Sequence, residues 1–256
     1  MKNVTIKNFP ALGYSANEAL NTLATNLTFS GPEYRKILIT SCHLSEGKSF
    51  LSMNIVRTLA KIGYRVALVD CDLRRSELAR KYFRFEDGQY MGVSNYLAGH
   101  AEMEDIIFES NIPNLRIVPR GKAVVNSLPL ISSDRLGKLL DALQEENDYV
   151  IVDAPPVGMI VDAARIASYC DGTVLIVSYN SVRRRELVDS KSQIEQSGCP
   201  ILGTVINQAD FSDYVNRKYY KNDYYHYYYM NGAGKKHAKT RHENAPAETD
   251  RDESKA

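Results

Sequence analysis

The chain has 256 residues, 25% of them charged, and a formal net charge of +1, which suits an ordinary globular protein with one large domain. Near-neutral charge without a basic stripe excludes nucleic acid as the expected main partner. No apolar run approaches the roughly 18 residues of a membrane span, and the first residues lack a signal-peptide core, so we expect a cytoplasmic protein. The four cysteines show no metal-ligand spacing, and we expect reduced thiols.

Apolar periodicity predicts alternating helices and strands along the chain. The predicted helices cover 15–29 with Ser15 as cap, 50–62, 93–97, a segment capped by Ser132 or Ser133, 162–169 and 184–196. The predicted strands cover 37–40, 65–69, 115–119, 149–152, 173–178 and 201–206. We expect surface helices and loops over 76–113 and a loop up to 130. This alternation predicts an α/β fold with a mostly parallel sheet, helices on both faces, and ligands at the carboxyl ends of the strands.

Residues 37–50, ILITSCHLSEGKSF, indicate a phosphate-binding loop between a strand and a helix. Gly47, Lys48 and Ser49 would supply backbone N–H groups, an ammonium group for the β and γ phosphates of ATP, and a hydroxyl for Mg²⁺. In the full pattern G-x-x-x-x-G-K-[ST] a glycine precedes the lysine by six residues, and Cys42 stands there. The expected nucleotide-binding residues are Ser45, Glu46, Gly47, Lys48, Ser49 and Phe50. The alternative is a chance match that only begins a helix.

Three carboxylates follow predicted strands and are expected at the same edge of the sheet. Asp153 comes after one strand and is expected to hold Mg²⁺ through water. Asp70 and Asp72 come after another, where one would assist the metal and the other would accept a proton from an attacking hydroxyl. The spacing leaves open which of the two is the base, and a solvated turn is the alternative.

Two further groups complete the predicted site and its surroundings. Arg74 or Arg75 is expected to balance charge or to pair with acidic residues on a neighbouring surface. Asn207 follows the last predicted strand and is therefore also placed at the carboxyl edge.

The composition changes after this strand. We predict a phosphate-loop domain over 1–216, a tyrosine-rich tail over 217–231, and a disordered polar tail over 232–256. A tyrosine-rich tail that binds a partner without being modified is the alternative to a phosphorylated one.

Five segments in this order resemble the bacterial tyrosine kinases of capsule and exopolysaccharide synthesis. They are ILITSCHLSEGKS, VALVDCDLRRSEL, YVIVDAPPVGMIVDA, DGTVLIVS and ILGTVIN, with the tyrosine cluster behind them. The resemblance is to the cytoplasmic type, whose transmembrane activator is a separate chain of the polysaccharide co-polymerase kind. It implies a kinase that transfers phosphate from ATP to protein tyrosine, on the fold of the partition and septum-positioning ATPases.

The resemblance also implies roles for particular residues. Lys48, Asp70, Asp72 and Asp153 would be catalytic, and Ser49 with the three aspartates would hold Mg²⁺. Asn207 would face the adenine. The implied autophosphorylation sites are Tyr219, Tyr220, Tyr224, Tyr225, Tyr227, Tyr228 and Tyr229. The kinase would act in trans as a homo-oligomer, through tails that enter neighbouring active sites, and would reach the inner face of the plasma membrane only through its activator.

The sequence departs from the family at three places. Leu44-Ser45 replaces a common Pro-Gly, and Asn21 and Ala24 replace two arginines of the Glu-x-x-Arg-x-x-Arg motif through which subunits form rings. His43 lies in the part of the loop where partition ATPases carry a signature lysine. Two alternative functions follow: an ATPase switch of the partition type without kinase activity, and an inactive scaffold of the polysaccharide machinery.

Overall fold

Nine strands form one mixed sheet in the computed structural model, which describes residues 2–7, 9, 12–86 and 88–209. The strands lie in the order β4-β1-β5-β6-β3-β7-β2-β8-β9. Their bounds are β1 (Lys2–Ile6), β2 (Lys36–Ser41), β3 (Val66–Asp70), β4 (Phe83–Phe85), β5 (Phe108–Ser110), β6 (Leu115–Val118), β7 (Tyr149–Asp153), β8 (Gly172–Ser178) and β9 (Ile201–Asn207). The predicted boundary at residue 216, the tyrosine cluster and the polar tail lie outside the described residues.

The sheet is mostly parallel, as predicted. Of the eight strand pairings among the described residues, only β1 with β4 and β5 with β6 are antiparallel. The central strands β3 and β7 are buried along their whole length. Their near-continuous apolar sequences suit strands that are covered on both faces.

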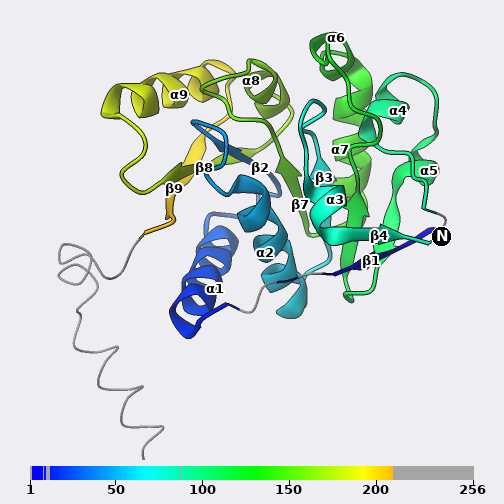
Figure 1. The fold of residues 1–256 in the computed structure, drawn as a ribbon, viewed down its shortest axis with the longest axis horizontal. Coiled ribbons are helices and arrows are strands. Elements are labelled where there is room, and N and C mark those ends of the chain that lie inside the picture. Colours follow the sequence, from blue (N-terminus) through cyan, green and yellow to red (C-terminus); the bar gives the residue numbers. More distant parts are fainter. Residues whose placement is uncertain (1, 8, 10–11, 87, 210–256) are drawn as a thin grey trace, which may run out of the picture. The chain divides into compact units, whose positions relative to one another are not determined.

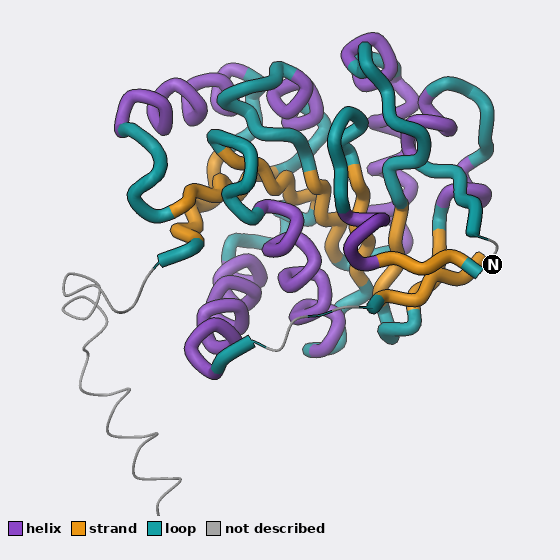
Figure 2. Tube along the Cα trace, in the orientation of Figure 1, coloured by secondary structure: helices purple, strands orange, loops and turns teal. Residues whose placement is uncertain are grey.

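Helices cover both faces of the sheet (Figures 1 and 2). The longer helices are α1 (Tyr14–Phe29), α2 (Lys48–Lys61), α7 (Asp134–Glu146) and α9 (Arg184–Gln196), and α8 (Asp162–Ala167) is shorter. Alternate residues of β3 show the two layers. Val66 and Leu68 pack in the cluster that contains α1 and α2, whereas Ala67 and Val69 pack in the cluster with α7, α8 and α9. The period of two along a strand therefore builds two separate apolar cores.

The structure corrects several local predictions. Residues 76–113 contain the expected short helices α3 (Leu78–Tyr82), α4 (Val93–Leu97) and α5 (Met103–Ile106), but also the strands β4 and β5. The segment predicted as a loop up to 130 contains the start of α6 (Leu128–Ile131). Strands of three residues are too short to show a recognisable period, which is why the sequence did not reveal them.

The first helix also begins earlier than predicted. Gly13, not Ser15, is the N-cap of α1, and Ser15 already lies inside the helix. The strand β1 had no counterpart among the predicted elements. None of the helices in the described part of the chain is both long and apolar enough to cross a membrane.

Candidate active site

The segment between β2 and α2 has the shape of a phosphate-binding loop. Gly47 is the N-cap of α2 with φ +86°, and a side chain there would also collide with the Asn207 amide, 2.1 Å from the position of a Cβ atom. Only glycine satisfies both conditions. The first N–H groups of a helix of 14 residues therefore open toward the loop, as anion binding requires.

Lys48 begins this helix and reaches the loop that follows β3. Its Nζ lies 3.2 Å from Oδ2 of Asp72, and both side chains are largely buried. Burial alone lowers the pKa of the Lys48 ammonium group, but the carboxylates of Asp153 and Asp72 outweigh burial and raise that pKa above its ordinary value. Lys48 is therefore a fixed positive charge at neutral pH.

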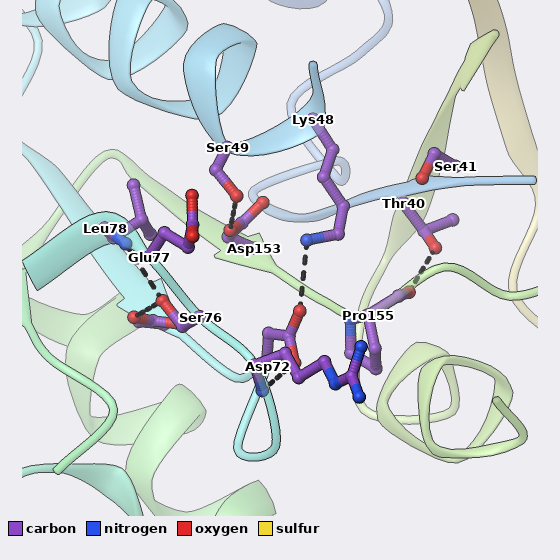
Figure 3. Close-up of polar contacts among 12 residues, drawn as sticks. Thr40, Ser41, Lys48, Ser49, Asp72, Ser76, Glu77, Leu78, Asp153 and Pro155 are labelled. Carbon is purple, nitrogen blue, oxygen red and sulfur yellow. Dashed lines mark hydrogen bonds and ion pairs between the residues drawn. The ribbon is translucent and has the colours of Figure 1, made fainter. Parts of the chain in front are cut away.

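Ser49 and Asp153 meet at the start of the same helix (Figure 3). Ser49 Oγ donates to Oδ2 of Asp153 at 2.7 Å, and Ser52 Oγ lies 2.9 Å from Oδ1 of the same carboxylate. Burial raises the pKa of Asp153 above its ordinary value, and Lys48 and the two serine hydroxyls offset part of that increase. Ser52 was not predicted as a site residue, although it lies one helical turn after Ser49 on the same face.

Asp70 lies beside Asp153, because the two residues are register partners across β3 and β7. The hydroxyl of Ser76 donates to Oδ2 of Asp70, while Oδ1 is buried and has no hydrogen-bond partner among the described residues. Burial, followed by the neighbouring Asp153 carboxylate, raises the pKa of Asp70 to about 8. Ser76 and Lys48 thus compensate the charged form of this buried group only in part in the free protein.

A cavity of about 660 Å³ opens in front of these residues. Asp72 lines it, but Asp70 and Asp153 do not. Its other lining residues are Leu44, Ser45, Gly47, Lys48, Ser49, Phe50, Arg75, Ser76, Glu77, Ala79, Arg80, Lys81, Tyr82, Tyr90 and Arg120. The structure therefore separates the three aspartates into one that faces the cavity and two that lie behind it.

The remaining predicted site residues are also near the loop. Asn207 ends β9, and its amide Nδ2 donates to the carbonyl of Glu46 at 2.9 Å. The Glu46 carboxylate turns away from the cavity and accepts hydrogen bonds from backbone groups instead. The adenine contact proposed for Asn207 stays a prediction.

Arg74 and Arg75 have different surroundings, because Arg75 lines the cavity whereas Arg74 forms an ion pair within the chain. Arg74 Nε lies 3.0 Å from Oδ2 of Asp162, a residue at the start of α8 that is 1% exposed. Ser127 contacts both partners. This ion pair ties the loop after β3 to the segment after β7. The acidic partner of Arg74 is therefore a residue of the same chain.

Comparisons with known proteins agree with this geometry. The family model described as AAA domain matches residues 35–183. The tyrosine-protein kinase CpsD of Streptococcus agalactiae is 39% identical over 204 residues, which cover 78% of this chain and 88% of that protein. The chain belongs to the CpsD-type family of bacterial tyrosine-protein kinases.

Solved structures place this kinase in the same fold. The kinase domain of the Escherichia coli tyrosine kinase ETK superposes with a TM-score of 0.70 at 30% identity, covering 77% of this chain and 78% of that one. The septum site-determining protein MinD from Pyrococcus horikoshii, solved with Mg-ADP, reaches a TM-score of 0.55 at 23% identity, covering 67% and 69%. The predicted family and the predicted fold class are therefore confirmed.

Proposed function

We propose that this kinase uses Mg-ATP to phosphorylate the tyrosines at 219–229 on a second copy of itself, and thereby regulates the synthesis and export of a capsular or exopolysaccharide polymer. The observation that carries the proposal is the arrangement of Lys48, Ser49 and three buried aspartates around one loop. Phosphoryl transfer needs positioned phosphates, charge neutralisation and an oriented nucleophile, and this arrangement offers a group for each.

The residues present fit a divalent cation. No group of three or more His, Cys, Asp or Glu side chains in the described residues forms a cage for a metal by itself. Mg²⁺ does not require one, because it keeps several waters and uses phosphate oxygens with one or two protein ligands. The unpartnered Oδ1 of Asp70 and the raised pKa values of Asp70 and Asp153 indicate a place where positive charge is lacking.

We therefore assign Ser49 to Mg²⁺ directly, and Asp153 and Asp70 to the waters around it. When bound there, Mg²⁺ would supply positive charge against the negative charge that develops on the phosphate during transfer. Lys48 would hold the β and γ phosphates. The contacts of Lys48 with Asp72, of Ser49 with Asp153, and of Asp153 with its strand neighbour Asp70 support these roles.

Asp72 is our candidate for the base that accepts the tyrosine proton. It lines the cavity from which an acceptor hydroxyl can approach, whereas Asp70 lies behind it. The Arg75 N–H and the Lys48 ammonium hold its two oxygens at 3.0 and 3.2 Å. A carboxylate fixed in this way has one orientation toward the acceptor.

The partner and location follow from the family resemblance. The activator would be a membrane protein whose cytosolic segment recruits this kinase to the inner face of the plasma membrane. The acceptor segment itself lies outside the described residues, so its role is tested by experiment.

A mixing experiment tests trans phosphorylation directly. Lys48→Met supplies an intact tail without the phosphate-binding lysine, and a variant with all seven tail tyrosines changed to Phe supplies an active site without acceptors. Each is incubated with Mg-ATP and the activator's cytosolic peptide, alone and then together. We expect phosphotyrosine only in the mixture, located on the Lys48→Met chain.

Each other outcome contradicts a specific part of the proposal. Signal in the all-Phe variant alone would place the main acceptor outside the tyrosine cluster. Signal in the wild type but not in the mixture would mean phosphorylation in cis. ATP hydrolysis without phosphotyrosine in the wild type would favour the ATPase switch, and neither activity would favour the scaffold.

A further inference from the structure

The ends of β8 and β9 hold the backbone of the phosphate loop. Asn207 Nδ2 donates to the carbonyl of Glu46 at 2.9 Å, and Gln208 Nε2 donates to the carbonyl of Ser45 at 3.1 Å. The hydroxyl of Ser178, the last residue of β8, donates a hydrogen bond to Oε1 of Gln208 at 2.5 Å. We call Glu46, Ser178, Asn207 and Gln208 the loop clamp.

Glu46 is the centre of this clamp. Its side chain is buried, and its two carboxylate oxygens accept different backbone hydrogen bonds. Oε2 accepts the N–H of His43 at 2.6 Å, within the loop, and Oε1 accepts the N–H of Ser178 at 3.0 Å, in the neighbouring strand. One side chain therefore fixes the loop to itself and to the sheet.

The Glu46 carboxylate has no cationic partner within the described residues. Burying a charge without one is unfavourable unless hydrogen bonds compensate, so the two N–H donors are the groups that retain it. Glu46 is also absent from the lining of the 660 Å³ cavity, although its neighbours Ser45 and Gly47 belong to it. A carboxylate that faced the cavity would repel phosphate, which is a second reason to place it behind the loop.

The loop has a specific need for such support. Ser45 has φ +65°, a left-handed conformation that costs any residue other than glycine, and Cys42 stands where the usual pattern has another glycine. Gln208, which contacts Ser45, is left-handed as well, with φ +57°. Contacts from outside the loop must keep these two residues in strained conformations.

We propose that Glu46 is a positioning residue. Its two backbone hydrogen bonds keep the phosphate loop in the conformation that binds nucleotide, and its side chain does not touch the nucleotide. The inference rests on the proposed use of this loop for Mg-nucleotide. It assigns a structural task to the Glu46 side chain, and the expectation that Glu46 is one of the nucleotide-binding residues of the loop stays a prediction. It also predicts that nucleotide binding, rather than the chemical step, suffers when the clamp is weakened.

The test is the affinity of the full-length protein for Mg-ADP, measured by calorimetry, so that no phosphate transfer is needed. Glu46→Gln keeps the shape of the side chain but puts an NH₂ donor against one of the two N–H donors. We expect about a tenfold higher Kd. Where kinase activity is present, KM for ATP should rise similarly, while kcat at saturating ATP changes less than about threefold.

Glu186→Gln is the matched control. Glu186 also contacts the loop, through His43 Nε2 at 3.3 Å, but both side chains are more than one third exposed. We expect less than a twofold change in Kd for this variant. A Kd for Glu46→Gln equal to that of the control would overturn the proposal.

A second variant covers the case in which Glu46→Gln fails to fold. Gln208→Ala leaves the buried carboxylate in place and removes only the contact with Ser45 and the partner of the Ser178 hydroxyl. We expect a threefold to tenfold weaker Mg-ADP affinity, with the unfolding temperature of the free protein lowered by only about 2 to 4 °C. Unchanged affinity here would contradict the clamp independently, and a kinase without phosphotransfer but with these affinity changes would leave it standing.

Discussion

The centre of the sheet and its β4 end use strands in different ways. Strands β3, β7 and β2 are parallel, five or six residues long, and buried between helices, and the carboxylates that end two of them are at most 1% exposed. Strands β4 and β5 have three residues each, and each takes part in an antiparallel pairing. The difference shows where charge can be concentrated. Only strands covered on both faces keep carboxylates in a low-dielectric place where one lysine interacts with all of them.

The sharpest test of this comparison removes the lysine at the centre. Lys48→Met should lower the initial rate of phosphotyrosine formation about 10³-fold, which corresponds to about 4 kcal/mol of activation free energy, because the phosphate charge loses a fixed partner. Lys61→Met, at the other end of α2, is the control and should leave the rate within about twofold. Rates are measured with the tail of a second chain as acceptor. Equal rates for the two variants would contradict a special role for Lys48.

The second test compares packing in the two regions. Leu68→Ala in β3 removes a fully buried side chain and should cost about 3 kcal/mol in the free energy of unfolding. Phe85→Ala in β4 should cost about 1 to 2 kcal/mol, since Phe85 is only partly buried and its main ring partner is Tyr90, stacked at 4.0 Å. Denaturant unfolding measures both. A larger cost at Phe85 would show that the β4 end carries more of the core than its burial indicates.

The third test concerns the link from the carboxylate loop to α8. Arg74→Ala should cost about 1.5 to 3 kcal/mol of unfolding free energy, because it leaves the buried Asp162 without its cation. Arg75→Ala is the matched control, and it should change unfolding by less than about 0.5 kcal/mol, since its side chain is exposed. The same denaturant titration serves for both variants. Equal costs would mean that Asp162 does not depend on Arg74.

A further test concerns the pH dependence of stability at Asp70. Its pKa of about 8 in the folded protein lies above its ordinary value of 3.8, so between these pH values the folded state holds a proton that the unfolded state has lost. The contribution of Asp70 to stability is therefore complete below about pH 4 and is lost as the pH rises through about 8. Asp70→Asn should flatten the fall in stability between pH 5 and pH 8 without nucleotide or metal. Urea unfolding at several pH values measures this, and identical slopes for variant and wild type would contradict the assignment.

The central region was largely predictable from the sequence. Buried strands such as β3 and β7 show continuous apolar runs, and the residues that end them had to meet at the carboxyl edge of a parallel sheet. Lys48, Asp70, Asp72 and Asp153 were therefore expected to lie close together from the sequence alone. The strands β4 and β5 were not predicted, because three residues are too few to show a period. The five-residue strand β1 was missed although its buried Val4 and Ile6 alternate with exposed residues, which is the ordinary signal of a half-buried strand.

Other features of the site depended on tertiary contacts that no local pattern encodes. Ser76 contacts Asp70, and Arg120 contacts the carbonyl of Ser76, from positions with no motif. The direction of the Glu46 side chain was equally impossible to predict. The sequence of a phosphate loop is the same whether its glutamate faces the ligand or the sheet. Spacing brought the predicted residues near one another, whereas burial and hydrogen bonds decide which way each one points.

The contact between Glu46 and Asn207 also has a consequence for biosynthesis. The two residues are 161 positions apart in the chain, so a ribosome completes the loop long before it makes the residue that holds it. Strand β7, which carries Asp153, pairs with residues that the ribosome made much earlier: Val66 of β3 lies 83 positions before its partner Tyr149, and Lys36 of β2 lies 114 positions before Val150. Contacts of such long sequence separation form slowly. The nucleotide site should therefore be among the last parts of the domain to mature, and a nascent chain that stops before β9 should carry a complete phosphate-loop sequence that is not yet a working site.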